Sequence, residues 1–384
     1  MAEFGFTETQ EMFRNMVRDF TRRELMPGAR ERMKQDQFPR ELIGKIADAG
    51  LLGLRIPEEY GGQMSDIVTN GIACEETGKS DLYPSYIISG GLLAGEVLKL
   101  CSEEVQREWM PQIPTGEKRI TISITEPDAG SDAVAIKAKA VRQGDDYVLS
   151  GEKTSVSLGM QADAVAIWVK TDPAAGAGGV TAFLVPVDLP GIERIPFDDM
   201  GFRTVGRASI AMDDVQVPAR YRIAEEGQGF YAVMGVFDWL RVILCIQVLS
   251  LGEQSVYDAI DYARQRTAFG KPIAKYDAVS FRLVDSLAKI EAIKLLCFKA
   301  LWLQDQGKRS TKETAMAKSL SPTIAIEACN NAMLTFGHVG YSSDYPVEQR
   351  LRDAMGFQFA DGTADIQRTI LVREIIGKEF VNYR

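Results

Sequence analysis

The chain has 384 residues, of which 46% are apolar and 25% charged, and it carries a net charge of −9. This composition is typical of a globular protein with a large buried core, and it excludes disordered and collagen-like chains. The acidic balance argues against a nucleic-acid-binding surface, because phosphates are held by concentrated Lys and Arg side chains.

Helical patterns fill residues 1–117, which predicts an N-terminal α-helical domain. Residues 7–10 (TETQ) form a capping-box sequence, and apolar residues follow at helical spacing through Phe20. Gly50 stands where a second helix would stop, and Ser102 stands where a later helix would start.

The pattern changes in residues 118–225, which predicts an antiparallel β-sheet domain. Short runs of branched and aromatic residues are separated by turn residues such as Gly and Asp. The candidate strands cover residues 120–124, 147–149, 164–169, 180–187 and 208–212. No alternation of strand and helix occurs here, which argues against a Rossmann-type dinucleotide fold.

Long helical patterns return in residues 226–384 and predict a C-terminal helical bundle. They cover residues 230–266, 278–306, 311–336 and 363–380. The expected fold class is therefore α+β, with an N-terminal helical domain, a middle β-domain and a C-terminal bundle.

The numbers and positions of the cysteines and histidines limit the kinds of catalytic and metal site that the chain can form. Five cysteines lie far apart without a C-x-x-C pair, which indicates reduced thiols and a cytoplasmic protein. His338 is the only histidine, so we expect neither a His-based triad nor a metal site. No run of eighteen apolar residues and no targeting segment is present, so we expect no membrane contact.

Four separated motifs resemble those of the acyl-CoA dehydrogenase family, in the family's order. Residues 124–132 (ITEPDAGSD) resemble its first signature, and residues 266–273 (RTAFGKPI) resemble its R-x-x-F-G-x-P-[IL] flavin segment. Residues 337–341 (GHVGY) and 350–353 (RLRD) resemble the G-G-x-G-Y…R-x-x-R-D region, and residues 361–368 (DGTADIQR) resemble E-G-T-x-x-I-Q-R. The resemblance covers nearly the whole chain. It implies the family's fold, an FAD cofactor, and electron-transferring flavoprotein as the electron acceptor.

The resemblance also implies which residues contact FAD. The residues implied at the flavin are Ile122, Ile124, Thr125, Gly130, Ser131, Ser155, Val156, Ser157, Asp277, Gly337, Thr363 and Asp365. Arg266 and Phe269 are implied to hold the adenosine-diphosphate half of a flavin that belongs to a neighbouring subunit, so a homo-oligomer, expected to be a tetramer, follows. From the residues alone, the small residues after Ile124 are equally an ordinary glycine turn, and Arg266 is equally a solvated arginine at a helix end.

Coenzyme A contacts are implied for Ser131, Asp238 and Arg241. The last two residues are three apart and share one helix face, so an intrahelical ion pair is the alternative. Gly91, Ala360 and Gly362 are further implied substrate-binding residues.

Asp361 is the predicted base. In the family, a carboxylate removes the proton next to the thioester carbonyl while a hydride leaves the neighbouring carbon for the flavin. Such a base needs a pKa raised by desolvation, and the enolate charge needs directed hydrogen bonds. Most members carry Glu at this position, and Leu240, where some relatives carry the base, is uncharged. The alternative role for Asp361 is a cap for the helix that begins near Thr363.

Small residues around Asp361 predict a bulky acyl group. Ala360 stands where the family usually has Tyr, Ser155 replaces a common Trp, and Gly90 and Gly91 lie in a helix that usually shapes the acyl pocket. We therefore expect a carbocyclic substrate, such as a cyclohexane- or cyclohexene-carboxyl-CoA, or an α-branched acyl-CoA.

Two other functions compete with this interpretation. A flavin oxidase that resembles nitroalkane oxidase would use Asp361 as the base on a substrate without coenzyme A. A non-catalytic flavin-binding protein would have no need for that carboxylate. Asp277, Leu334 and His338 depart from the family's pattern, so the two ends of the flavin are expected to be held by partly different groups.

Overall fold

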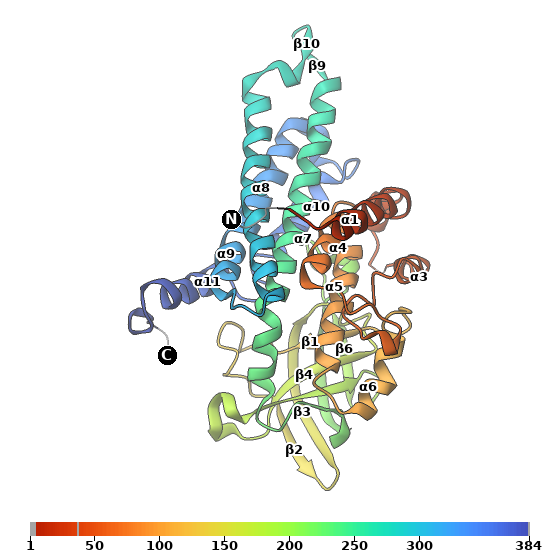
Figure 1. Ribbon diagram of the computed structural model, residues 1–384, viewed down its shortest axis with the longest axis vertical. Coiled ribbons are helices and arrows are strands. Elements are labelled where there is room, and N and C mark those ends of the chain that lie inside the picture. Colours follow the sequence, from red (N-terminus) through yellow and green to blue (C-terminus); the bar gives the residue numbers. More distant parts are fainter. Residues whose placement is uncertain (1–4, 37, 383–384) are drawn as a thin grey trace.

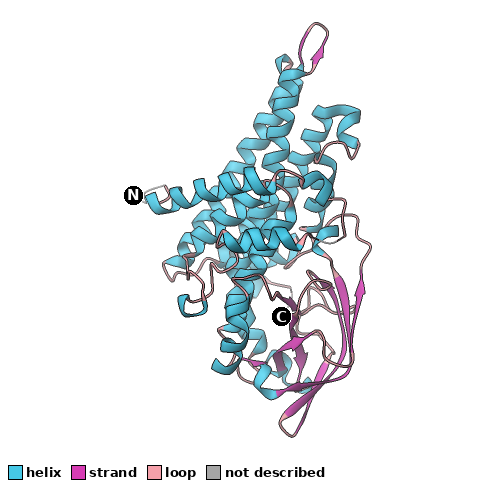
Figure 2. Ribbon diagram, turned by 90° about the vertical axis from the view of Figure 1, so that its right-hand side faces the viewer, coloured by secondary structure: helices cyan, strands magenta, loops and turns pink. Residues whose placement is uncertain are grey.

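The computed structural model describes residues 5–36 and 38–382, and it confirms the α+β class (Figure 1). Helices come first along the chain, a β-domain follows, and a second set of helices ends it. The strands of the β-domain gather at one end of the molecule beneath the helices, and a short two-stranded hairpin lies at the opposite end (Figure 2).

The N-terminal region packs its helices around two buried ones. Its helices are α1 Glu8–Phe20, α2 Ala29–Arg32, α3 Arg40–Asp48, α4 Ile67–Gly78, α5 Leu82–Leu98 and α6 Glu103–Trp109. The predicted capping box is confirmed, because Thr7 and Gln10 each accept the other's backbone N–H through their side chains. The sequence did not predict α4, since every residue of this helix is buried and no polar stripe marks its period.

The middle region is a mixed sheet and not the purely antiparallel one that the sequence predicted. Its strands are β1 Ile120–Ser123, β2 Lys139–Gln143, β3 Asp146–Val156, β4 Ala164–Lys170, β5 Val180–Pro186, β6 Ile192–Pro196, β7 Ala208–Pro218 and β8 Arg222–Ile223. They are ordered β6-β7-β3-β2-β4-β5-β8, with β1 also on β4. Both β1 and β2 run parallel to β4. Side-chain alternation indicates a strand but not the direction of its partner, which explains the error.

The C-terminal region consists of long helices with a short hairpin at one tip. Its helices are α7 Gly229–Gln265, α8 Asp277–Asp305, α9 Thr311–Phe336, α10 Val347–Gly356 and α11 Ala364–Leu371. The hairpin of β9 Thr267–Ala268 and β10 Lys271–Pro272 joins α7 to α8 far from the sheet (Figure 1). The helix predicted over residues 363–380 is shorter than expected. A π-helical turn follows Leu371, and the helical conformation ends at Gly377, which has a φ of 139°.

The helix α7 is long and apolar enough, by composition alone, to cross a membrane. Within its most apolar window, 65% of the residues are buried inside the protein. Val242, Ile243 and Ile246 are among those with no exposed surface. This burial is the pattern of a core helix in a bundle.

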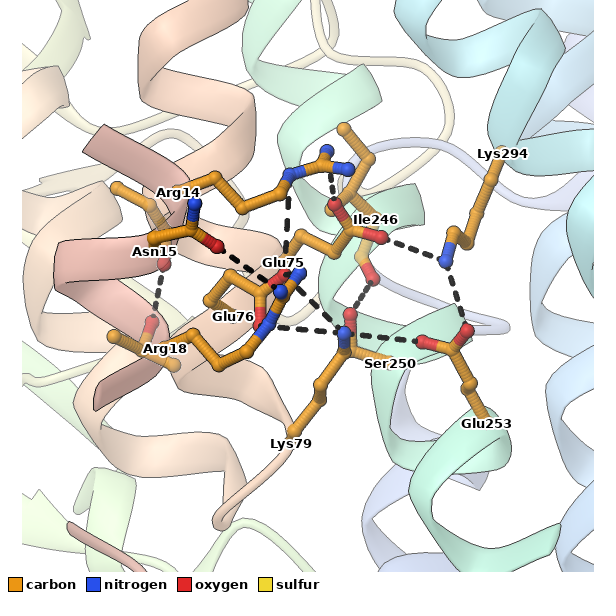
Figure 3. A network of polar contacts seen from close by, with 12 residues as sticks. Arg14, Asn15, Arg18, Glu75, Glu76, Lys79, Ile246, Ser250, Glu253 and Lys294 are labelled. Atoms are coloured by element: carbon orange, nitrogen blue, oxygen red, sulfur yellow. Dashed lines mark hydrogen bonds and ion pairs between the residues drawn. The ribbon is translucent and has the colours of Figure 1, made fainter. Parts of the chain in front are cut away.

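A buried network of charged groups joins α1, α4, α7 and α8 (Figure 3). Lys294 of α8 contacts Glu75 of α4 at 2.6 Å and Glu253 of α7 at 2.9 Å. Arg14 of α1 contacts Glu75 at 2.8 Å. The charge of Lys294 offsets the burial of Glu75 and holds the pKa of that carboxyl below its usual value.

Replacing Lys294 by Met should destabilise the protein, because Glu75 and Glu253 would then be buried without their shared cation. We expect the free energy of unfolding, measured by denaturant titration, to fall by about 3–5 kcal/mol. The control is Lys289→Met on the same helix. Its ion pair with Glu327 is about half exposed, so the loss is expected to stay below about 1 kcal/mol. Equal losses in the two variants would contradict the prediction.

Candidate active site

A buried ion pair shapes the loop that follows β1. The carboxylate of Glu126 accepts hydrogen bonds from the backbone N–H groups of Lys137 and Ala138, at 2.6 and 3.0 Å, and from Lys153 Nζ at 2.7 Å. Lys153 is fully buried and also donates to the Ile124 carbonyl at 2.9 Å. Burial lowers the pKa of Lys153 to about 8, against the opposing charge of Glu126. The Glu126–Lys153 ion pair thereby holds residues 124–132 against β3.

Two of the predicted flavin segments lie side by side on this frame. The Thr125 carbonyl accepts from the Thr154 backbone N–H at 2.9 Å, which joins residues 122–131 to residues 155–157. Ser155 is exposed at a bulge in β3 and has a φ of 58°, a conformation that costs a non-glycine residue about 1–3 kcal/mol. A side chain added at Gly130 would meet no atom within 4 Å. The surface is thus open and lined by small residues.

Within this surface, Ile122, Ile124 and Thr125 are half-buried and Ser131 is exposed. Val156 is buried, with only 2% of its surface exposed, so its backbone is the part that a ligand could contact.

Asp361 lies on a tight turn between α10 and α11. It has a φ of 51°, and Gly362 follows with a φ of 92°. The cap of α11 is Thr363, whose side chain accepts from the Ile366 backbone N–H at 3.4 Å. The helix-cap alternative for Asp361 is therefore wrong. Asp365, in the first turn of α11, is exposed and pairs with Arg368.

Asp361 is half-buried, and its carboxylate has no close cation. Burial raises its pKa, and the charges of Arg241 and Lys318 act in the opposite direction. Among the residues that the structure describes, no Lys or Arg nitrogen comes within the 4.0 Å of an ion pair with this carboxylate. A raised pKa without a fixed ion pair is the arrangement that a general base requires.

Arg241 contacts the turn that carries Asp361. Its Nε donates to the Asp361 carbonyl at 3.0 Å, and its terminal nitrogen lies 3.9 Å from Asp238. Asp238 in turn accepts from the Thr311 hydroxyl at 2.8 Å. The ion-pair alternative for these two residues is thus observed in the chain, while their contact with coenzyme A stays a prediction.

Gly91 has a packing role in the structure. A Cβ there would come within 2.6 Å of the Leu52 carbonyl, so the glycine lets α5 approach that backbone. The cavity beside it measures about 20 Å³, room for about one water molecule. The argument for a widened acyl pocket therefore depends on Ala360 and Ser155.

The remaining predicted cofactor residues gather at the opposite end of α7. Arg266 and Phe269 belong to the hairpin segment, and the Phe269 side chain is 97% exposed. Asp277 starts α8, and Gly337 follows Phe336, whose ring packs on Tyr262 near the end of α7. Along α7, Arg241 and Arg266 are on the order of 40 Å apart at about 1.5 Å per residue. One chain does not bring these residues to Asp361.

Comparison with known proteins identifies the family. Models of the acyl-CoA dehydrogenase N-terminal, middle and C-terminal domains match residues 7–117, 121–215 and 227–376. The probable acyl-CoA dehydrogenase YngJ of Bacillus subtilis is 33% identical over 97% of this chain and 99% of its own.

The chain belongs to the acyl-CoA dehydrogenase family.

Two further relatives are close over the full length. CarC, a subunit of the caffeyl-CoA reductase–Etf complex of Acetobacterium woodii, is 34% identical over 97% of this chain and all of its own. The structure of butyryl-CoA dehydrogenase from Megasphaera elsdenii is 31% identical, with a TM-score of 0.92, over 97% of this chain and all of its own. As a member of this family, the protein is an oxidoreductase that acts on CH–CH groups.

Two residues that were not expected from the sequence contact segments of the predicted site. Tyr86 of α5 donates to the Ser157 hydroxyl at 3.1 Å, and burial together with the Asp361 charge raises its pKa to about 12. Lys318 of α9 is 1% exposed and donates to the Phe357 carbonyl at 2.8 Å. Tyr86 carries no signal in its apolar helix. Lys318 does, because it interrupts a face of small residues that continues through Ser321 and Ala325.

The pKa of Asp361 should control the pH dependence of this acyl-CoA dehydrogenase. Only the ionised carboxylate can take a proton, so kcat/KM should fall as pH drops through that pKa. Because burial raises the pKa, the acidic limb should lie above the ordinary Asp value of about 3.9. The measurement is kcat/KM against pH with butyryl-CoA. An acidic limb at or below the ordinary value would contradict the assignment.

Proposed function

We propose that this chain is an FAD-dependent acyl-CoA dehydrogenase in which Asp361 removes the α-proton of the acyl group. The observation that carries the proposal is the half-buried carboxylate on its left-handed turn, without an ion-pair partner among the described residues and with a pKa that burial raises. FAD is the family's cofactor, and when bound it accepts the hydride from the β-carbon.

The reaction balances as the loss of one proton and one hydride. The α-C–H bond breaks toward an Asp361 oxygen, the β-C–H bond breaks as a hydride, and a carbon–carbon double bond forms between the two carbons. The chain's task is to hold the carboxylate beside the α-carbon and to exclude water. The Tyr86–Ser157 hydrogen bond links one wall of the site to the segment that would contact the flavin.

The open surface of Gly130, Ser131 and Ser155 fits a flavin ring, because small residues there leave space above the backbone. The hairpin residues Arg266 and Phe269 would hold the adenosine-diphosphate half of a flavin bound to a second copy of the chain. Their distance from Asp361 along α7 and the exposure of Phe269 support this arrangement. The functional unit is then a homo-oligomer, proposed to be a tetramer.

The coenzyme A chain is proposed to pass Ser131, Asp238 and Arg241. Ser131 is exposed, and Arg241 uses Nε on the Asp361 carbonyl, so its terminal nitrogens are available to a ligand. Because Asp238 and Arg241 also have partners within the chain, they do not by themselves distinguish a dehydrogenase from an oxidase. The full-length similarity to enzymes named for acyl-CoA substrates favours the dehydrogenase over the oxidase.

For the acyl group we propose a carbocyclic or α-branched chain. The small side chains of Ala360 and Ser155 and the short Asp361 support this choice. The relatives' names do not converge on one substrate, since one is named for caffeyl-CoA and another for butyryl-CoA.

The electron acceptor is proposed to be electron-transferring flavoprotein, because CarC is named as a subunit of a complex with Etf. A cytoplasmic location is supported by the five cysteines, all of which are free and buried.

Replacing Asp361 by Asn should abolish turnover while FAD stays bound, because the amide keeps the size of the side chain but cannot accept the proton. We expect kcat to fall by about 10²–10⁴-fold. FAD absorbance and turnover of cyclohexanecarboxyl-CoA with an artificial electron acceptor are the measurements. Asp19→Asn, at an exposed position of α1, is the control, because it makes the same chemical change away from the predicted site residues. Full turnover in the Asp361 variant would disprove the proposed base.

Anaerobic bleaching of the flavin should distinguish the acyl groups. We expect cyclohexanecarboxyl-CoA or an α-branched thioester to bleach the flavin at least about tenfold faster than butyryl- or octanoyl-CoA. Adding or removing one or more methylenes in an apolar pocket changes specificity by about this factor. Fastest bleaching by a straight chain would refute the substrate proposal. Oxygen consumption without saturable binding of any thioester would favour the oxidase.

A further inference from the structure

The turn that carries Asp361 is held at both of its ends by cations from two different helices. Arg241 of α7 donates to the Asp361 carbonyl at 3.0 Å. Lys318 of α9 donates to the Phe357 carbonyl at 2.8 Å, where α10 ends. Both cations bind backbone oxygens and leave the carboxylate without a close ion pair.

Four lysines are buried, and their ammonium groups differ in the acceptors that surround them. Lys294 contacts two carboxylates, and Lys153 contacts one carboxylate and one carbonyl. In the part of the chain that the structure describes, the ammonium groups of Lys318 and Lys170 each donate to one carbonyl, that of Phe357 and that of Gly176, and contact no carboxylate. A desolvated ammonium with a single neutral acceptor is costly to keep, and of these two only Lys318 is bound to the segment that carries Asp361.

The charged and titratable groups around this ammonium come from each helix packed on it. Arg241 and Cys245 face it from α7, and Asp361 faces it from the turn. Asp361 is itself faced by Arg241, Lys318 and, from α5, Tyr86. Within this set, Asp361 is the one carboxylate, and Lys318 is the cation that pairs with no acid.

We propose that Lys318 is a positioning residue for the base of the dehydrogenation. Its hydrogen bond to Phe357 fixes where the α10–α11 turn begins, and its charge keeps the desolvated Asp361 ionised without pairing with it. A direct ion pair would lower the basicity of Asp361 and fix the position of its carboxylate oxygens. The ammonium of Lys318 binds a backbone carbonyl instead, so it lowers the basicity less and leaves the oxygens free to meet the substrate. The inference rests on the proposed role of Asp361.

Two variants of the FAD-loaded enzyme separate the hydrogen bond from the charge. Lys318→Met removes both, and Lys318→Gln keeps an N–H that can reach Phe357 but removes the charge. In both, the acidic limb of kcat/KM should move to higher pH by about one unit, because a cation that lowers the pKa of Asp361 is lost. In Lys318→Met, kcat should also fall by about tenfold to a hundredfold as the turn loses its anchor.

The measurements are FAD content, thermal midpoint, and kcat/KM against pH with butyryl-CoA and cyclohexanecarboxyl-CoA. Lys170→Gln is the matched control, since it removes another buried ammonium that donates to one carbonyl, that of Gly176 between β4 and β5, and it should leave the pH profile unchanged. Lys318→Gln is the variant expected to fold if the Met variant does not. A wild-type pH profile in Lys318→Gln would overturn the inference.

The Asp361→Asn background distinguishes this failure from failure of the proposed function. If Asp361 is the base and Lys318 acts through it, adding Lys318→Met to Asp361→Asn should cause no further loss of the residual rate. If Asp361→Asn keeps full turnover, the base assignment fails whatever the lysine variants do. If Asp361→Asn is inactive and both lysine variants resemble the wild type, only the role of Lys318 is wrong.

Discussion

The ammonium of Lys294 lies between Glu75 and Glu253 inside the helical core, and the ion pairs around it determine how α7 runs through the molecule (Figure 3). Arg14 extends the same network to α1. Buried charges tolerate little displacement, because moving one partner leaves the other desolvated and unpaired. The network therefore fixes α7 against the N-terminal helices, and α7 in turn carries Arg241 to the turn of Asp361.

The four buried lysines differ in the acceptors that surround their ammonium groups. Lys294 contacts two carboxylates, and Lys153 contacts one carboxylate and one carbonyl. Among the described residues, Lys170 and Lys318 each donate to one carbonyl only, that of Gly176 between β4 and β5 and that of Phe357 before the Asp361 turn. The ammonium bound to the turn of the proposed base is therefore one of the two least compensated, so its field is not cancelled by a carboxylate of its own.

Local features of the fold could be predicted, and features that depend on which segments meet could not. The cap at Thr7, the long C-terminal helices and the acidic residue before Gly362 follow from neighbouring residues. The parallel pairing of β1 with β4 depends on the path of the chain, which no periodic pattern records. The proposed role of Lys318 depends on its hydrogen bond to a turn about forty residues later in the chain. From the sequence alone it could be recognised only as a lysine on a buried helix face.

The close approach of Gly91 to the Leu52 carbonyl links the position of Tyr86, which donates to Ser157, to the packing of the N-terminal helices. A larger residue at 91 would meet backbone at 2.6 Å and would push α5 outward. Tyr86, five positions earlier on the same helix, would move with it and lose its alignment with Ser157. A substitution at position 91 would therefore be felt at Ser157, so the glycine constrains the predicted flavin segment through the packing of a helix that lies beside it.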